Sequence, residues 1–178
     1  MKMRISYGKN VYDKKEIGAV LNTLKKSTQM GDSVSNFEKK IAKLSSKKYG
    51  LMVNSGSSAL ILALKIFNFP KGSEIIAPCL NFGTAISSII LSNLKPIFVD
   101  CEIDTLQIDI KKIEKKISKK TRALLIPNLI GNIPDWIEIK KLALKHNLKV
   151  IEDSADTLGA KINNKPTGVY SDISITSF

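Results

Sequence analysis

Apolar residues recur along this chain with two different periods. From about residue 13 onwards, stretches with helical spacing alternate with short apolar runs of strand length, an order typical of a parallel sheet with helices on its faces. Helices are predicted at 13–26, from 32 or 33 to 44, at 57–67, at 84–93 and from near Pro134. Strands are predicted at 51–54, 74–78, 97–100, 123–127 and 149–153. The pattern therefore predicts an α/β fold with a mostly parallel sheet sandwiched by helices.

The two N-terminal helices precede the first predicted strand, and we expect Asp13 and either Asp32 or Ser33 to cap them. Residues 1–33 are expected to form a helical arm. Residues 34–178 are expected to form one large domain, because no linker or repeat interrupts the series. The last eight residues, 171–178, alternate like a strand and stop at Phe178 without a turn or cap. We therefore expect this domain to be truncated, with its C-terminal part missing.

The composition is that of an ordinary globular protein, with 43% hydrophobic and 25% charged residues. No apolar run approaches the roughly 18 to 20 residues that span a bilayer, and the N-terminus lacks the apolar stretch of a secretory signal. We expect a cytoplasmic protein without membrane contact. Cys79 and Cys101 have no CxxC spacing or histidine partner, so free thiols are expected and no metal site is predicted.

The formal net charge of +12 raises the question of nucleic-acid binding. Of the 28 basic residues, however, only Arg4 and Arg122 are arginine, the residue that base readout and phosphate recognition favour. The densest run, KKIEKKISKK at 111–120, is expected to be the outer face of an amphipathic helix in preference to a phosphate site. A nucleic-acid-binding module is therefore a weak alternative, and no nucleic-acid partner is predicted.

Asn54 to Ser58 join the predicted strand at 51–54 to an apolar helix. Backbone N–H groups and hydroxyls at a helix N-terminus favour a phosphate, although serine is equally common as a simple helix cap. The segment contains neither GxGxxG nor GxxxxGK[ST], which disfavours a dinucleotide-binding domain and a P-loop nucleotidase.

Asp153 ends the predicted strand KVIED, at the edge of the sheet where ligands bind in open α/β folds. Its carboxylate is a candidate partner for a protonated ring nitrogen or a metal, with capping of the next turn as the structural alternative. Glu152 is expected to face the opposite side of the sheet, and Asp156 the same crevice as Asp153. His146 is the only histidine, so no Ser-His-Asp or Cys-His constellation exists and hydrolase mechanisms are excluded.

Taken together, these features resemble the DegT/DnrJ/EryC1/StrS family of sugar aminotransferases and dehydrases, which bind pyridoxal phosphate on an aspartate-aminotransferase-like fold. The resemblance covers nearly the whole chain. The segments that carry it are FEKKIAKL (37–44), NSGSSALILAL (54–64), GSEIIAP (72–78), PIFVD (96–100), LQIDI (106–110), KTRALLIPNLIGN (120–132) and VIEDSADTLGA (150–160). The resemblance implies that residues 34–178 are the cofactor-binding large domain of such an enzyme.

The resemblance also implies roles for individual residues. Gly56, Ser57 and Ser58 match the family's SGT-type turn, which holds the cofactor phosphate, and Ser177 matches a serine that adds a further hydroxyl. Phe82 matches the aromatic that stacks on the pyridine ring. Asp153 matches the aspartate that pairs with the ring nitrogen and keeps it protonated.

In this family the catalytic position lies a few residues beyond the serine that Ser177 matches, and hence beyond Phe178. A lysine there implies an aminotransferase, and a histidine implies a 3-dehydrase that holds the cofactor without a covalent bond. Aminotransferases usually carry glutamine or histidine where this chain has Asp156, a candidate auxiliary catalytic residue, and EDSADTLG resembles the CDP-4-keto-6-deoxyhexose 3-dehydrases. We therefore favour a dehydrase of nucleotide-sugar and lipopolysaccharide biosynthesis that uses pyridoxamine phosphate, with an aminotransferase as the alternative.

Several expectations about partners follow from the resemblance alone. The full-length protein is expected to be a homodimer with a nucleotide-sugar substrate, and a dehydrase would receive electrons from an iron–sulfur reductase. A catalytically inactive fragment or pseudoenzyme is the alternative from another class. Three asparagines are candidate crevice residues by position only: Asn81, Asn128 and Asn132.

Overall fold

The structure is a computed structural model that describes residues 10–26, 28–29 and 31–178. It divides into two compact units, Met1–Phe37 and Glu38–Phe178. The first unit contains helix α1 (Lys14–Lys26), and helix α2 (Asp32–Leu44) begins there and ends in the second unit. The predicted domain boundary after residue 33 stays a prediction, and residues 1–9 of the predicted arm lie outside the described residues.

Asp13 caps α1 as expected. Its carboxylate accepts a hydrogen bond from the Lys15 backbone N–H (2.7 Å), and the Glu16 carboxylate accepts one from the Asp13 N–H (2.7 Å). This reciprocal capping box satisfies two N–H groups that otherwise lack a helical acceptor. The local sequence D-x-x-E therefore determines where α1 starts.

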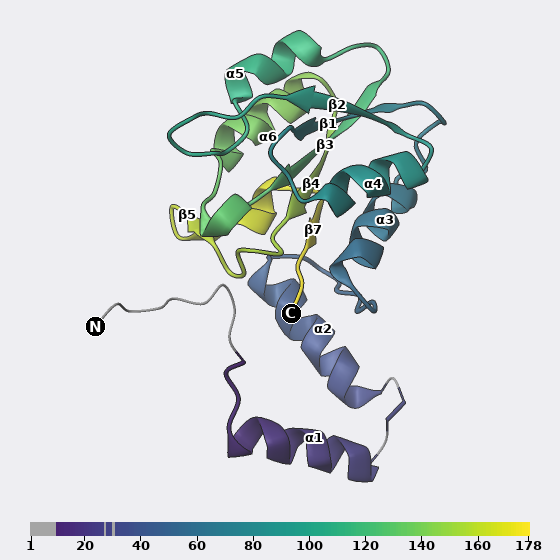
Figure 1. Ribbon diagram of the computed structural model, residues 1–178, viewed down its shortest axis with the longest axis vertical. Helices are drawn as coiled ribbons and strands as arrows, with labels where there is room; N and C mark the ends of the chain where they lie inside the picture. Colours follow the sequence, from purple (N-terminus) through teal and green to yellow (C-terminus); the bar gives the residue numbers. More distant parts are fainter. Residues whose placement is uncertain (1–9, 27, 30) are drawn as a thin grey trace, which may run out of the picture. The chain divides into compact units, whose positions relative to one another are not determined.

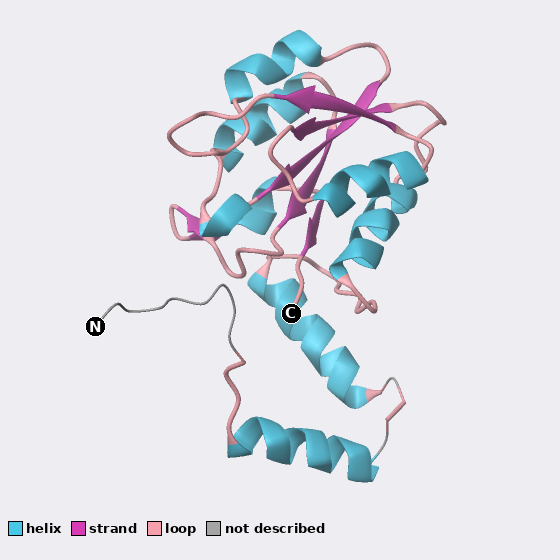
Figure 2. Ribbon diagram, viewed as in Figure 1, coloured by secondary structure: helices cyan, strands magenta, loops and turns pink. Residues whose placement is uncertain are grey.

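The second unit is built on a five-stranded sheet in which every neighbouring pair is parallel, in the order β2-β1-β3-β4-β7 (Figures 1 and 2). The strands are β1 (Glu74–Pro78), β2 (Lys95–Val99), β3 (Thr121–Pro127), β4 (Lys149–Asp153) and β7 (Ile173–Ile175). Because all five run the same way, their carboxyl ends share one edge of the sheet. The predicted α/β fold with a mostly parallel sheet is confirmed.

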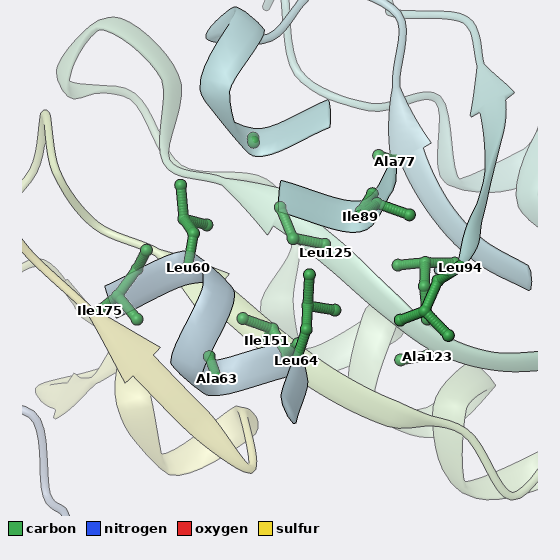
Figure 3. Packing of buried hydrophobic residues seen from close by; sticks show 12 residues of the cluster. Leu60, Ala63, Leu64, Ala77, Ile89, Leu94, Ala123, Leu125, Ile151 and Ile175 are labelled. Atoms are coloured by element: carbon green, nitrogen blue, oxygen red, sulfur yellow. The ribbon is translucent and has the colours of Figure 1, made fainter. Parts of the chain in front are cut away.

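Helices cover both faces of this sheet (Figure 1). Helices α3 (Gly56–Ile66) and α4 (Gly83–Leu91) pack on one face, where Leu60, Leu64 and Ile89 meet Leu125 and Ile151 (Figure 3). Helices α5 (Ile110–Ile113) and α6 (Trp136–Lys145), with the 3₁₀ turn η1 (Glu114–Lys116), cover the other.

Strand β3 shows why the central strands have continuous apolar runs. Ala123 and Leu125 enter one core cluster, whereas Leu124 and Ile126 enter the other. Successive side chains of a strand point to opposite faces, so a strand covered on both faces needs apolar residues at every position.

Two of the predicted elements are wrong. Residues 51–54 form no strand: Leu51 and Met52 are exposed, and the Met52 N–H donates to the Glu38 side chain (2.7 Å) rather than to a neighbouring strand. The run at 111–120 is not one helix either. It comprises the single turn α5, capped by Asp109, and then η1, after which Ile117 is extended.

A small hairpin was not predicted. Strands β5 (Lys161–Ile162) and β6 (Lys165–Pro166) are antiparallel and precede the 3₁₀ turn η3 (Thr167–Tyr170). The connecting Asn163 and Asn164 both have positive φ, 49° and 63°. Asparagine tolerates this region, and a two-residue turn of this type matches the twist of a hairpin, so the pair Asn-Asn was the available signal.

Gly168 in η3 packs against the backbone of Ser45, just after α2, and this close approach can be tested. A Cβ built there lies 2.0 Å from the Ser45 backbone oxygen, a distance that only a backbone shift relieves. We expect Gly168→Ala to lower the free energy of unfolding by at least about 2 kcal/mol, measured by urea denaturation. Gly83→Ala is the matched control, because a Cβ there meets nothing within 4 Å; a Gly168→Ala variant as stable as this control contradicts the packing.

Candidate functional site

The site lies at the carboxyl edge of the sheet, where the predicted cofactor residues follow three different strands. Phe82 follows β1, Asp153 ends β4, and Ser177 follows β7. In the strand order, β4 is the direct neighbour of β7 and is separated from β1 by β3. The parallel topology alone thus brings Asp153 and Ser177 to the same edge as Phe82, from which they are 71 and 95 positions away in sequence (153 − 82 and 177 − 82).

The N-terminus of α3 completes this edge. Ser55 caps the helix: its side chain accepts a hydrogen bond from the Ser58 N–H (3.2 Å) and donates to the Ser58 hydroxyl (3.1 Å). Among the described residues, nothing accepts a hydrogen bond from the N–H groups of Gly56 and Ser57. Free N–H groups in the first turn, together with the helix dipole, make an anion-binding position. Because the cap uses Ser55, it leaves these N–H groups open to a phosphate.

Ser177 contacts this helix terminus directly. A Cβ built on Gly56 lies 3.3 Å from the Ser177 Cβ and 3.4 Å from its Oγ, so the missing side chain of Gly56 is what lets the two segments approach. Hydrogen bonds extend the β4–β7 pairing beyond the last paired residues, from the Ser154 N–H to the Ile175 oxygen (2.8 Å) and from Thr176 Oγ1 to the Ser154 oxygen (3.2 Å). This pairing determines the position of Ser177.

Asp153 is a buried carboxylate without a cationic partner among the described residues. Burial raises the pKa of its carboxyl, and the nearby Asp156 and Glu152 carboxylates raise this pKa further, whereas the hydrogen bond from the Ala155 N–H (3.1 Å) lowers it. A buried, negatively charged group with like charges around it favours a positively charged ligand.

Phe82 is 68% exposed although it lies at the start of α4. An aromatic ring left in solvent at the edge of a sheet is available for stacking on a flat ligand. The preceding Asn81 accepts a hydrogen bond from the Phe82 N–H (2.8 Å), while its Nδ2 is buried without a partner in the structure. Asn81 therefore positions Phe82 and keeps one unused donor.

Asp156 is brought to the same edge, where its carboxylate accepts a hydrogen bond from the Ile130 N–H (3.3 Å). Ile130, in the 3₁₀ turn η2 (Leu129–Gly131), has φ 57° and is 70% exposed. Five of the eight described non-glycine residues with positive φ are asparagine, whereas a β-branched residue in this region is strained. The strained turn is held by Asp156 and by the buried Gln107, whose Nε2 donates to the Leu129 oxygen (3.2 Å).

Asn128, predicted by position to face the crevice, belongs instead to the interior. Its Nδ2 donates to Glu152 Oε1 (2.9 Å) and Ser154 Oγ (2.6 Å), and its Oδ1 accepts a hydrogen bond from the Trp136 indole N–H (2.7 Å). Both polar groups of the Asn128 side chain are used within the protein. Asn132 ties the loop after β2 in place through the Thr105 oxygen (3.3 Å).

Glu152 has a structural function that the sequence did not reveal. It is 1% exposed and accepts hydrogen bonds from Ser154 Oγ (3.1 Å), Ser171 Oγ (3.3 Å) and Ser174 Oγ, in addition to Asn128. Lys47 Nζ donates to the Ser171 oxygen (2.5 Å) and hydroxyl (3.1 Å). Burial lowers the pKa of Lys47, and the charge of Glu152 partly offsets that effect.

His146 caps the carboxyl end of α6 and contacts Glu114 (2.9 Å), away from the edge that holds Asp153. Within the part of the chain that the structure describes, no group of three histidine, cysteine, aspartate or glutamate side chains has metal-binding geometry. No helix in the same part is long and apolar enough to cross a membrane.

The chain matches the model of the DegT/DnrJ/EryC1/StrS aminotransferase family over residues 10–178. A match over almost the entire chain shows that this protein belongs to that family, as the motifs at 54–64 and 150–160 indicated.

Two curated relatives bear the names of the two predicted activities, a dehydratase and an aminotransferase. The chain is 34% identical over 168 residues to a GDP-4-keto-6-deoxy-D-mannose 3-dehydratase of Yersinia pseudotuberculosis, covering 90% of this chain and 43% of the relative. It is 35% identical over 171 residues to a dTDP-3-amino-3,6-dideoxy-alpha-D-galactopyranose transaminase of Aneurinibacillus thermoaerophilus, covering 95% and 47%. The chain thus spans less than half the length of either relative.

Among solved structures, the chain resembles the Escherichia coli GDP-4-keto-6-deoxy-D-mannose-3-dehydratase with bound hydrated PLP. The TM-score is 0.82 and the identity 33%, with 88% of this chain and 42% of the other covered. The expected aspartate-aminotransferase-like fold is confirmed by this likeness to a pyridoxal-phosphate-binding protein.

The raised pKa of Asp153 predicts how stability depends on pH. Since the folded-state pKa lies above the unfolded value of about 3.9, the contribution of Asp153 to stability is fully present below about pH 3.9 and is lost as the pH rises through the folded-state pKa. We expect Asp153→Asn to be more stable than the wild type at pH 7 by about 1 kcal/mol, with the difference shrinking towards pH 4.5 in urea titrations.

The control for this substitution is Asp104→Asn, which neutralises an exposed carboxylate in the loop after β2. It is expected to change stability by less than about 0.5 kcal/mol at any pH in the range. An Asp153→Asn protein that is less stable than the wild type at pH 7 contradicts a desolvated Asp153.

The backbone strain at Ile130 gives a second prediction. Ile130→Asn replaces an exposed β-branched residue by one that tolerates positive φ, so the free energy of unfolding is expected to rise by about 1 kcal/mol. Ile103→Asn is the matched control, because Ile103 is 91% exposed in a neighbouring loop and is absent from the described positive-φ residues. Equal effects of the two substitutions contradict strain at Ile130.

Proposed function

We propose that this chain binds pyridoxal or pyridoxamine 5′-phosphate at the carboxyl edge of its sheet. The observation that carries the proposal is the meeting of three segments: the free N–H groups of α3, Ser177 packed on Gly56, and the buried Asp153 on the adjacent strand. Each offers what one part of the cofactor requires, namely an anion site, a hydroxyl donor and a negative charge beside a protonated nitrogen.

Each of these residues is proposed to contact one part of the cofactor. Gly56, Ser57 and Ser58 hold the phosphate with backbone N–H groups and hydroxyls, and Ser177 adds a further hydroxyl. Phe82 stacks on the ring and excludes water from one of its faces. Asp153 keeps the proton on the ring nitrogen, and that positive charge in turn lowers the pKa of Asp153. When bound, the cofactor supplies an electron-accepting ring for chemistry at the substrate carbon.

We further propose that the full-length protein removes the C3 hydroxyl of a nucleotide-linked 4-keto-6-deoxyhexose. This is supported by Asp156, which lies in the edge beside Asp153 and holds the Ile130 turn, and by the dehydratase name of the Yersinia relative. The names of the two relatives refer to GDP and dTDP sugars, so the CDP nucleotide expected from the motif EDSADTLG is not part of the proposal. Transfer of an amino group is the second candidate, supported by the transaminase relative.

A cofactor-binding experiment tests the site. The probe is pyridoxamine 5′-phosphate, because the aldehyde of pyridoxal phosphate reacts with lysine side chains and this chain has 26 lysines among its 28 basic residues. Calorimetric titration is expected to show one site, weakened about tenfold or more by Asp153→Asn and by Ser177→Ala, since each loses a hydrogen bond to a charged group.

Asp104→Asn again serves as the control and is expected to bind like the wild type. Absence of binding to the wild-type chain, or equal binding by all four proteins, contradicts the proposed site. The first of these results is also the one expected of an inactive fragment.

The reaction is tested on the full-length protein with a nucleotide-linked 4-keto-6-deoxyhexose, L-glutamate and pyridoxal phosphate. Mass spectrometry of the sugar distinguishes loss of the C3 oxygen, expected of the dehydratase, from gain of an amino group, expected of the aminotransferase. An unchanged sugar contradicts both. The expected homodimer, the iron–sulfur reductase, the cytoplasmic location and the destination in lipopolysaccharide stay predictions.

A further inference from the structure

The two cysteines lie side by side at the carboxyl edge, at the ends of the adjacent strands β1 and β2. Pro78 pairs with Val99, and the pairing continues one residue further through a hydrogen bond from the Cys79 N–H to the Val99 oxygen (2.8 Å). The Cys79 thiol lies 3.2 Å from the Val99 oxygen and 3.7 Å from Asp100 Oδ1. Asp100 Oδ1 also accepts a hydrogen bond from the Cys101 N–H (2.9 Å).

The two thiols lie close enough to interact. Burial raises the pKa of the Cys101 thiol, and the nearby Cys79 thiol raises this pKa further, whereas the Leu80 backbone N–H lowers it. In the extended pairing, Cys101 is the diagonal neighbour of Cys79, and strands about 4.8 Å apart with a rise of about 3.3 Å per residue place such Cα atoms about 6 Å apart. Disulfides span Cα separations of about 4.4 to 6.8 Å, so the two backbones are close enough for a bond once the two side chains turn towards each other.

We propose that Cys79 and Cys101 are a reversible redox site, in which exchange with a small-molecule disulfide joins them and thereby shifts the segment 79–82 that carries Phe82. The second part of this inference rests on the proposed cofactor site; the first part does not. Both cysteines are free thiols in the structure, which is the reduced state of such a site.

The exchange balances without any group from the protein other than the two thiols. The exposed Cys79, as its thiolate, attacks one sulfur of oxidised glutathione and releases one reduced glutathione. The Cys101 thiolate then attacks the Cys79 sulfur and releases the second. The protein loses two hydrogens as its own disulfide forms, and oxidised glutathione takes them up to become two molecules of reduced glutathione. Burial raises the pKa of Cys101, so the second step is expected to speed up with rising pH.

The disulfide would act on the cofactor site through Leu80 and Asn81, the two residues between Cys79 and Phe82. Its formation turns the Cys101 sulfur away from the Leu80 N–H and the Cys79 sulfur away from Val99 and Asp100. The side chain of Asn81 has a buried Nδ2 without a partner. Among the described residues, its Oδ1 accepts a hydrogen bond from the Phe82 N–H alone. The segment therefore has few bonds of its own to resist the shift.

The first experiment treats the 178-residue chain with oxidised glutathione and follows intact mass and free thiols under denaturing conditions. The wild type is expected to lose two hydrogens and to fall from two free thiols to none. Cys101→Ser is expected to stop at the glutathione adduct of Cys79, and the double variant Cys79→Ser/Cys101→Ser to stay unmodified. A wild-type chain that keeps both thiols, or carries two glutathiones, overturns the inference.

The second experiment measures pyridoxamine 5′-phosphate binding to the reduced and oxidised chains. Oxidation is expected to weaken binding about fivefold or more, and dithiothreitol to restore it, while the double variant responds to neither reagent. Equal affinity in both states overturns the link to Phe82. Absence of binding in both states overturns the cofactor proposal, and the link to Phe82 with it, and this result is distinguishable because disulfide formation is scored separately.

Discussion

The hydrogen-bonded carboxylate of Glu152 is the interaction on which the geometry of the site depends. It joins Asn128 at the end of β3 to Ser171 and Ser174 around the start of β7, and Lys47 closes the cluster from the carboxyl side of α2. A buried carboxylate persists only where its desolvation is offset by such hydrogen bonds. The cluster therefore fixes β3, β4 and β7 relative to one another, and with them the positions of Asp153 and Ser177.

The adjacent residues Glu152 and Asp153 show how a strand separates structural from functional chemistry. Successive side chains of a strand point to opposite faces, so Glu152 reaches a cluster of hydroxyl and amide donors. Asp153 reaches the carboxyl edge instead, where its carboxylate accepts a hydrogen bond from the Ala155 N–H. Glu152 stabilises the fold. Asp153 carries the desolvation cost that a bound cation would remove, a common arrangement at sites that bind charged ligands.

The sequence predicted the parts of this structure that depend on local pattern. Strands 74–78 and 149–153 have the predicted bounds, because all of their residues except Lys149 are buried and most are apolar. Segment 51–54 is equally apolar in sequence but has no strand beside it, and no local pattern reports that. The Glu152 cluster was not predictable for the same reason, since Lys47 and Ser171 meet it over more than 100 residues and 19 residues respectively.

Four features that cost the fold stability lie at the carboxyl edge. Asp153 is desolvated, Ile130 is strained, Phe82 is exposed, and Asn81 leaves a buried donor unused. Each is tolerated because the cores on both faces of the sheet are continuous apolar clusters, which supply the dominant favourable free energy of folding. A bound ligand would account for two of these features together, since a flat group with a protonated ring nitrogen would offset the buried charge of Asp153 and cover the ring of Phe82, while its phosphate would bind the N–H groups of α3.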